Sequence, residues 1–194
     1  VTNVNRQVPA LSGTEGRAKV AVMAERVRLI NPECRVTEVQ EFFAASNAER
    51  LLAPEFAAVV DAIDAVGPKC ELLAACRARG RRVIVSGAAG GRLDGTAVRV
   101  ADLAAVSHDR LLAEVRKRLR RDYGFPATGK EFGVPAVFSS EPPVKPEPPT
   151  CAEDEAIPTG ARMNCEWGYG SATFVTGAFG FAAAGWVVRE IASG

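Results

Sequence analysis

The sequence predicts an α/β fold built on an open, doubly wound sheet. Segments with the apolar pattern of strands alternate with segments whose apolar residues recur at three- and four-residue steps, as in amphipathic helices. Residues 56–63 form a nearly continuous apolar run, which is typical of a strand covered on both faces in a parallel sheet. Apolar residues make up 47% of the chain and charged residues 24%, which suits one core in one soluble domain. The alternation therefore favours one sheet with crossover helices.

The first quarter of the chain is predicted to hold two helices around a short strand. The apolar positions of the first helix, residues 18–30, are Val20, Met23, Ala24, Val27 and Ile30. Asn31 and Pro32 end this helix, because a residue before proline leaves the helical region. Residues 36–39 alternate as a short strand does. A second helix is expected to begin at Ser46 as the N-cap and to end before Pro54.

The middle of the chain continues with strand, helix and strand. The strand over 56–63 delivers Asp64 at its carboxyl end. A helix over 68–79 follows, with a proline in its first turn, and Gly80 occupies the position of a left-handed cap. Residues 82–85 form the next strand. Asp64 is thereby predicted to lie at the sheet edge where open α/β folds bind ligands.

The last part of the chain predicts two further strands and two helices. Strands are expected over 97–101 and 134–139, and a helix over 109–123. The inward positions of this helix are Leu111, Leu112, Val115 and Leu119. Residues 141–160 are rich in proline and acidic side chains, so we expect a mobile loop. Residues 171–192 form a long apolar helix.

Two groups of residues could bind a nucleotide. Arg6 and Lys19 could neutralise a polyphosphate, because fixed cations stabilise the charge that develops on a leaving pyrophosphate. The carboxylate of Asp64 could hold magnesium against phosphates. Taken singly, the two cations also fit ordinary surface charges, and Asp64 also fits a helix N-cap.

Several segments, in their order and spacing, resemble the adenylating domain of the ubiquitin-activating-enzyme superfamily, and most closely its tRNA threonylcarbamoyladenosine dehydratase branch. The matching segments are Asn3-Val4-Asn5-Arg6-Gln7, Gly16-Arg17-Ala18-Lys19, Met23-Ala24-Glu25-Arg26, Ile30-Asn31-Pro32-Glu33-Cys34, Asp61-Ala62-Ile63-Asp64 with Pro68-Lys69, Ser86-Gly87-Ala88-Ala89-Gly90-Gly91, Val100-Ala101-Asp102-Leu103, Val137-Phe138-Ser139-Ser140-Glu141 and Gly168-Tyr169-Gly170-Ser171-Ala172-Thr173. The resemblance covers essentially the whole chain. It implies one ThiF-like, Rossmann-like adenylating domain over residues 1–194, with a strand and helix extension at the C-terminal end.

The resemblance also implies an activity. Members of this branch use ATP to adenylate the carboxylate of threonylcarbamoyladenosine in tRNA, and the acyl-adenylate then cyclises with loss of AMP. By position, Asn3, Arg6 and Lys19 are expected to contact ATP and Asp64 to hold magnesium, which makes Arg6 and Asp64 the expected catalytic residues. A cytoplasmic homodimer acting on tRNA is expected, with a sulfur-transfer or carrier protein as a further possible partner.

The sequence departs from the family at its start. Four features of the family are expected before Val1: the first strand, the glycine-rich nucleotide loop after it, an acidic residue for the ribose and an arginine donated across the dimer. The domain is therefore expected to be N-terminally incomplete, and the chain alone to bind ATP poorly. The glycines at 87–91 do not replace that loop, because a turn and a strand follow them rather than a helix. They are expected instead to allow close backbone approach near the active site.

The five cysteines narrow the choice among relatives. They form no CxxC pair, so the sequence predicts no zinc site and fits the reduced thiols of a cytosolic protein. Enzymes that adenylate a sulfur-carrier protein commonly carry such pairs, which makes that activity the alternative. Cys165 aligns with a cysteine of the branch and is either a reactive thiol or a structural residue. A non-catalytic scaffold built on the same fold is the other alternative.

Local charge and one apolar helix suggest further partners. Because the formal net charge is only +1, nucleic-acid binding has to come from local patches. One basic run, predicted to lie on an exposed helix face, consists of Arg116, Lys117, Arg118, Arg120 and Arg121. A second basic cluster consists of Arg77, Arg79, Arg81 and Arg82. Each is either a solvated surface or a contact for tRNA phosphates.

Residues 171–188 are nearly free of charge, so the last helix is expected to pack on the sheet or a dimer partner, with peripheral membrane association as the alternative. His108 is expected to be a surface residue.

Overall fold

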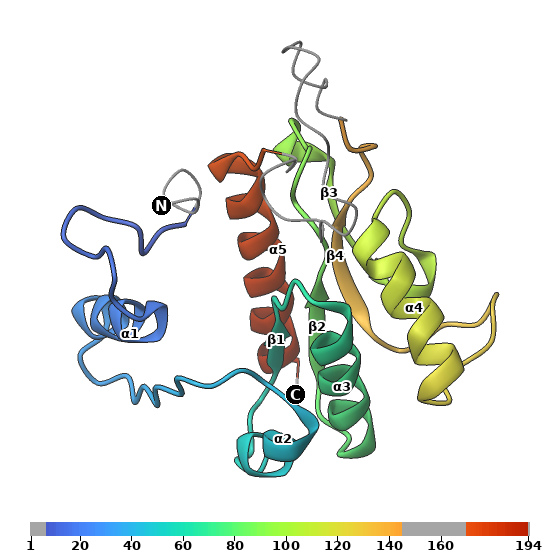
Figure 1. The fold of residues 1–194 in the computed structure, drawn as a ribbon, viewed down its shortest axis with the longest axis horizontal. Coiled ribbons are helices and arrows are strands. Elements are labelled where there is room, and N and C mark those ends of the chain that lie inside the picture. The colour runs from blue at the N-terminus through green and yellow to red at the C-terminus, as the bar shows by residue number, and fades with distance from the viewer. Residues whose placement is uncertain (1–6, 145–169, 194) are drawn as a thin grey trace, which may run out of the picture.

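The computed structural model describes residues 7–144 and 170–193 (Figure 1). Its strands are β1 Val59–Asp61, β2 Val83–Ser86, β3 Val98–Asp102 and β4 Pro135–Ser139. Its α-helices are α1 Lys19–Ile30, α2 Ala45–Leu51, α3 Val66–Ala78, α4 Arg110–Asp122 and α5 Thr173–Ala192. Two short 3-10 helices, Gly95–Ala97 and Leu103–Ala105, flank β3.

The four strands form one sheet in the order β1-β2-β4-β3. β1, β2 and β4 are parallel, with Val59 beside Val83 and Val85 beside Ala136, whereas β3 pairs antiparallel with β4. The crossover connections place α3 and α4 on one face of the sheet, because a chain that returns to a parallel strand has to cross the sheet. The carboxyl ends of the three parallel strands therefore share one edge.

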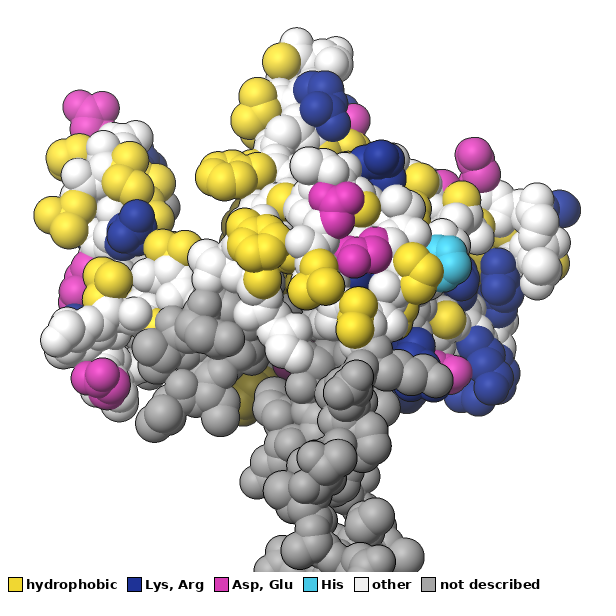
Figure 2. Space-filling view, turned by 90° about the horizontal axis from the view of Figure 1, so that it is seen from above, with side chains coloured by type: hydrophobic (Ala, Val, Ile, Leu, Met, Phe, Trp, Pro, Cys, Tyr) yellow, Lys and Arg dark blue, Asp and Glu magenta, His cyan; other side chains and the backbone are white. Residues whose placement is uncertain are grey.

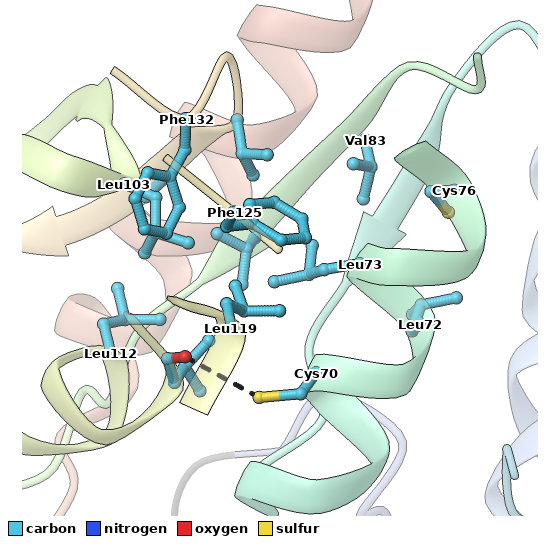
Figure 3. Close-up of a cluster of buried hydrophobic side chains, with 14 of the residues drawn as sticks. Cys70, Leu72, Leu73, Cys76, Val83, Leu103, Leu112, Leu119, Phe125 and Phe132 are labelled. Carbon is cyan, nitrogen blue, oxygen red and sulfur yellow. Dashed lines mark hydrogen bonds between the residues drawn. The ribbon is translucent and has the colours of Figure 1, made fainter. Parts of the chain in front are cut away.

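Alternate side chains of the central strands enter two separate cores. Val83 and Val85 of β2 pack with α3 and α4, whereas Ile84 faces α5 together with Val137. In the larger core Leu73, Leu119 and Phe125 point toward one another (Figure 3). The period of two in the strands decides which residue serves which core.

The ends of the helices follow local chemistry. Asp109 caps α4, because its Oδ1 accepts a hydrogen bond of 2.8 Å from the amide of Leu112. Gly80 has a φ of 60°, which confirms the left-handed position expected after α3. The prediction of Ser46 as the N-cap of α2 is wrong. Ala44 is the N-cap, and its amide donates to Oδ1 of Asn47 at 3.0 Å.

Two predicted strands differ from the structure. Residues 36–39 form no strand, because no strand lies beside them in the described part of the chain and a strand requires a paired neighbour. The strand predicted over 56–63 is reduced to β1. It lies at the edge of the sheet, with Val60 52% exposed, so the expectation of cover on both faces is also wrong.

Helix α1 forms where the sequence predicts it, but its apolar face does not enter the main core. Figure 1 places α1 apart from the sheet. Val22 and Ala24 are buried, whereas Ile30, predicted to face inward, is 75% exposed. The helical period therefore predicts the helix correctly but does not identify the surface against which its apolar face packs.

Helix α5 covers the face of the sheet opposite to α3 and α4. Val175, Phe179 and Ala183 are its buried residues and pack with β2 and β4. With a mean hydropathy of 1.2, α5 is also long and apolar enough to cross a membrane. Its docking on the sheet agrees with the expectation of a packed helix. Of the predicted loop over 141–160, residues 145–160 lie outside the described residues.

The buried cysteines provide a test of the core. Burial raises the pKa of Cys70 and of Cys76 to about 11, whereas Cys34 is exposed. At pH 8 a thiol with that pKa is ionised to roughly one part in a thousand, and the thiolate is the nucleophile. We expect iodoacetamide to alkylate Cys34 at least about 100-fold faster than Cys70 or Cys76 in the native protein. Peptide mass spectrometry measures each rate, and urea-unfolded protein is the control. Equal native rates would contradict this packing.

Candidate functional site

The candidate site is the sheet edge where β1, β2 and β4 end. In open α/β sheets ligands bind beyond the carboxyl ends of the strands. Three segments meet there: residues 61–64 at the end of β1, residues 86–88 at the end of β2 and residues 139–141 at the end of β4. The amino ends of α3 and α4 face the same edge, since α3 follows β1 directly and Asp109 contacts the segment after β2.

A fully buried ion pair connects the ends of β1 and β2. Nζ of Lys69 lies 3.0 Å from Oδ2 of Asp61, and both side chains have 0% exposure. The same ammonium donates a hydrogen bond of 3.1 Å to the carbonyl of Ser86. Burial raises the pKa of Asp61 and lowers the pKa of Lys69, because each charge has left water. The pair fixes α3 to both strands.

This ion pair was not predicted from the sequence. Asp61 and Lys69 stood out in the sequence only as members of segments that resemble the family. The available signal was physical: a carboxylate within a buried strand requires a partner, because an unpaired buried charge is strongly destabilising. Lys69, in the first turns of the next helix, was the nearest cation following in sequence.

Asp109 holds the segment after β2 against α4. While Oδ1 caps the helix, Oδ2 accepts a hydrogen bond of 2.8 Å from the amide of Ala88. A Cβ on Gly87 would lie only 2.1 Å from Oδ2 of Asp109. The close backbone approach expected of the glycine run therefore occurs at Gly87, and glycine is required there by space rather than by a positive φ.

The end of β4 is tied to the loop before β3. The carboxylate of Glu141 accepts hydrogen bonds of 3.1 Å from the amides of Leu93 and Asp94. The amide of Val144 donates to the carbonyl of Gly91 at 2.8 Å. Backbone amides at this edge are thus already paired with carboxylates, and the loop has a defined path.

Asp64 lies three residues beyond β1, at this edge, and is exposed. Lys19 is exposed at the first residue of α1, which stands apart from the sheet in Figure 1, so the described residues do not bring Lys19 to Asp64. Asn3, Arg6 and Cys165 lie outside the described residues. Their roles remain predictions.

Magnesium fits Asp64 only as a metal held jointly with a ligand. Within residues 7–144 and 170–193 no cluster of three or more His, Cys, Asp or Glu side chains could hold a metal ion. Magnesium is commonly bound by one or two carboxylates together with the phosphates of a substrate and water. A single exposed carboxylate at a ligand-binding edge suits that mode and does not suit a metal held by protein alone.

The basic run on α4 is less exposed than predicted. Figure 2 shows Lys and Arg side chains gathered on the side of the molecule that carries α4. Several of them, however, are engaged within the protein. Arg116 donates to the carbonyl of Leu103 at 3.3 Å, and Arg120 donates to the carbonyl of Pro126 at 3.2 Å. Asp122 forms ion pairs with Arg118 at 3.5 Å and with Arg121 at 2.6 Å.

None of the five basic side chains of this run is buried, but only Lys117 and Arg121 are exposed. Arg116 and Arg120 are half-buried, and burial lowers the pKa of Arg116. The guanidinium of Arg120 also lies 4.9 Å from the ring centroid of Phe132. Their stems cover the core, as arginine stems do when the charged head can still reach a polar group. Lys117 is the member of the run that is exposed with no ion pair among the described residues.

The second basic cluster is also partly structural. The guanidinium of Arg77 lies 4.4 Å from the ring centroid of Phe125 and donates to the carbonyl of Gly124 at 3.2 Å. Arg82 donates to the carbonyl of Glu190 at 2.9 Å, at the end of α5. These arginines connect α3 and β2 to neighbouring segments. His108, as predicted, is exposed, and its carbonyl accepts from the buried Arg92.

Comparison with known proteins identifies relatives of this chain in sequence and in structure. The model of the ThiF family matches residues 1–191. The tRNA threonylcarbamoyladenosine dehydratase of Haemophilus influenzae is 44% identical over 98% of this chain and 72% of its own length, and that of Escherichia coli K12 is 42% identical with the same shares. A crystal structure of the Escherichia coli tRNA N6-threonylcarbamoyladenosine dehydratase in complex with ATP has a TM-score of 0.84 and 39% identity, over 100% of this chain and 72% of that one. A complex with AMP matches equally well.

The contact between Gly87 and Asp109 predicts an effect on stability. In Gly87→Ala the new methyl group would push the segment after β2 away and break the hydrogen bond between Ala88 and Asp109. We expect a loss of about 1–3 kcal/mol in the free energy of unfolding, the usual cost of overpacking. Urea denaturation measures it.

The matched control for Gly87→Ala is Gly177→Ala, where a Cβ would meet nothing within 4 Å. Inside a helix this control should be neutral or stabilising by about 0.5–1 kcal/mol. Equal urea midpoints for Gly87→Ala and the wild type would show that the close approach has no energetic consequence.

Proposed function

The chain belongs to the ThiF family, and from that premise we propose that it is an ATP-dependent tRNA threonylcarbamoyladenosine dehydratase. The observation that carries the proposal is the 44% identity over 98% of the chain to a relative of that name. The family resemblance and the Rossmann-like class predicted from the sequence are confirmed. The alternatives of carrier-protein adenylation and a non-catalytic scaffold gain no support from these relatives.

The proposed reaction removes one water in two steps. A carboxylate oxygen of threonylcarbamoyladenosine attacks the α-phosphorus of ATP, and the bond to pyrophosphate breaks. A nucleophile within the same modified nucleoside then attacks the acyl carbon, and AMP leaves with the carboxylate oxygen. The ring that closes has lost the elements of water, and ATP has become AMP and pyrophosphate. Adenylation supplies the leaving group that the free carboxylate lacks.

The residues of this chain would bind and orient the reactants. The exposed carboxylate of Asp64 is proposed to hold magnesium against the phosphates, which neutralises charge on the leaving pyrophosphate. The paired segments after β2 and β4 provide a fixed wall beside it. Asn3, Arg6 and Lys19 remain the proposed ATP contacts, and Cys165 the proposed reactive thiol.

The assembly and surroundings of the enzyme are also part of the proposal. Its substrate is tRNA, so we place it in the cytoplasm, where tRNA is available. A homodimer is proposed from the family resemblance. A sulfur-transfer or carrier protein remains a possible partner, and the apolar outer face of α5 leaves peripheral membrane association as a secondary proposal.

The activity is tested with tRNA that carries threonylcarbamoyladenosine, incubated with ATP, magnesium and the whole protein. Mass spectrometry of the nucleosides should show the loss of one water, dependent on ATP. Asp64→Asn should lower kcat/KM about 10²-fold, on the scale of removing one preorganised electrostatic contact to a transition state. Arg6→Ala is expected to act in the same direction.

The matched control for Asp64→Asn is Glu49→Gln, another exposed carboxylate, which lies on α2 away from the sheet edge. This control should retain wild-type kcat/KM. Intact ATP binding without water loss in the wild type would favour the carrier-protein alternative. Full activity of Asp64→Asn would remove Asp64 from the site.

The contact with tRNA is tested by the salt dependence of binding. Each phosphate contact that is lost lowers the slope of log K against log salt by about one unit. Lys117→Ala with Arg121→Ala removes the two most exposed cations of the run and should reduce the slope measurably in fluorescence anisotropy. The control with Arg35→Ala and Arg50→Ala removes equal charge from the exposed segment around α2. Equal slopes for both double variants would show that α4 does not contact tRNA.

A further inference from the structure

The ion pair between Lys69 and Asp61 has no role in the chemistry proposed above. Lys69 is among the largest fully buried side chains, and its exposure is 0%. An ammonium that has lost all contact with solvent cannot contact ATP in this arrangement. Nor does stability explain its presence, because replacing a buried ion pair by neutral residues of similar volume is often neutral or stabilising. The remaining contacts of the pair are with backbone groups of the candidate site.

The pair holds two backbone segments of the candidate site. On β1, Oδ1 of Asp61 accepts a hydrogen bond of 2.9 Å from the amide of Ile63, which bends the chain immediately before Asp64. On β2, the ammonium of Lys69 holds the carbonyl of Ser86, the residue before Gly87. One side chain thus fixes the direction of both segments as they leave the sheet.

The helix completes this frame. The amide of Lys69 donates to the carbonyl of Ala65 at 3.1 Å, in the first turn of α3, so Lys69 moves with the start of that helix. Beyond Ser86, the segment after β2 continues to its contact with Asp109. The other carboxylates that act electrostatically on Lys69 are Asp64 and Asp109. The charge of each raises the pKa of Lys69, against the larger lowering that burial causes.

We propose that Lys69, held by Asp61, is a positioning residue that sets the carboxylate of Asp64 and the segment 86–88 in the geometry needed for binding ATP with magnesium and for adenylation. It acts without touching either reactant. The inference rests on the proposed function, because it assigns the pair to the same site. A misplacement of about 1 Å at a reacting group can cost about 10²-fold in rate, which is the scale on which a positioning residue acts.

The test separates position from stability with a double variant. Lys69→Met alone leaves the buried carboxylate of Asp61 unpaired and should lower the urea midpoint clearly. Adding Asp61→Asn removes that charge and keeps an oxygen that can accept from Ile63, so the midpoint should return close to the wild-type value. If the pair positions the site, the double variant should still show about a 10- to 100-fold lower kcat/KM for ATP. The magnesium concentration for half-maximal activity should also rise.

A destabilised control excludes a trivial loss of activity. Cys76→Ala removes a buried thiol from α3, away from the strand ends. It should lower the urea midpoint and leave both the magnesium dependence and the KM for ATP unchanged. Asp61→Asn alone is the second variant, because it keeps Lys69 and its contact with Ser86. It should raise the magnesium requirement in the same direction as the double variant, but less.

Three results would overturn the proposal. The first is a double variant with a wild-type urea midpoint that also keeps wild-type kcat/KM and magnesium dependence. The second is an unchanged magnesium requirement in Asp61→Asn, and the third is a loss of activity in Cys76→Ala equal to that of the double variant. Calorimetric titration with ATP and magnesium supplies a readout that does not depend on the dehydration. If the wild type binds ATP with magnesium yet removes no water from the modified tRNA, the proposed function fails. Weaker binding by the double variant would then still support the positioning role, and unchanged binding would overturn it.

Discussion

The parallel pairing of β2 with both β1 and β4 is the constraint on which the rest of the structure depends. Parallel neighbours cannot be joined by a tight turn, so helices have to cross the sheet between them. In this chain the crossings place α3 and α4 on one face, and α5 then covers the other. All three strands consequently deliver their carboxyl ends to one edge, together with the amino ends of two helices. The position of the candidate site follows from this pairing.

Cover on both faces determines which polar groups the site can use. β2 is buried along most of its length, so polar groups beside it have to be paired within the protein. Lys69 forms an ion pair with Asp61 and donates to the carbonyl of Ser86, while Asp109 accepts from the amide of Ala88. Asp64, three residues beyond β1, is exposed to solvent. The site thus has a paired, rigid inner part and an exposed outer part that is free to meet a ligand.

The sequence predicted those elements whose evidence is local. The helices α3, α4 and α5 were identified within about two residues, since an apolar face, a proline in the first turn and a glycine cap are written in consecutive positions. The strand expected over 36–39 failed, because pairing depends on a neighbour that local sequence does not specify. The burial of Lys69 was not predicted for the same reason, since lysine is almost never fully buried unless another residue pairs with it. Fold class and family were within reach because many separate segments agreed in order.

The arginines of α4 show why a count of charges overestimates the surface available to RNA. The guanidinium groups of Arg116 and Arg120 bind backbone carbonyls, and Arg121 is paired with Asp122. With a formal net charge of +1, the long-range field of the molecule is also weak. Electrostatic attraction can therefore supply only a modest part of the recognition of tRNA. Contacts to individual bases can add to this attraction, because single-stranded RNA loops present bases that a protein can contact individually. Selectivity for one modified position is the result expected when the site, rather than the surface charge, provides most of the binding.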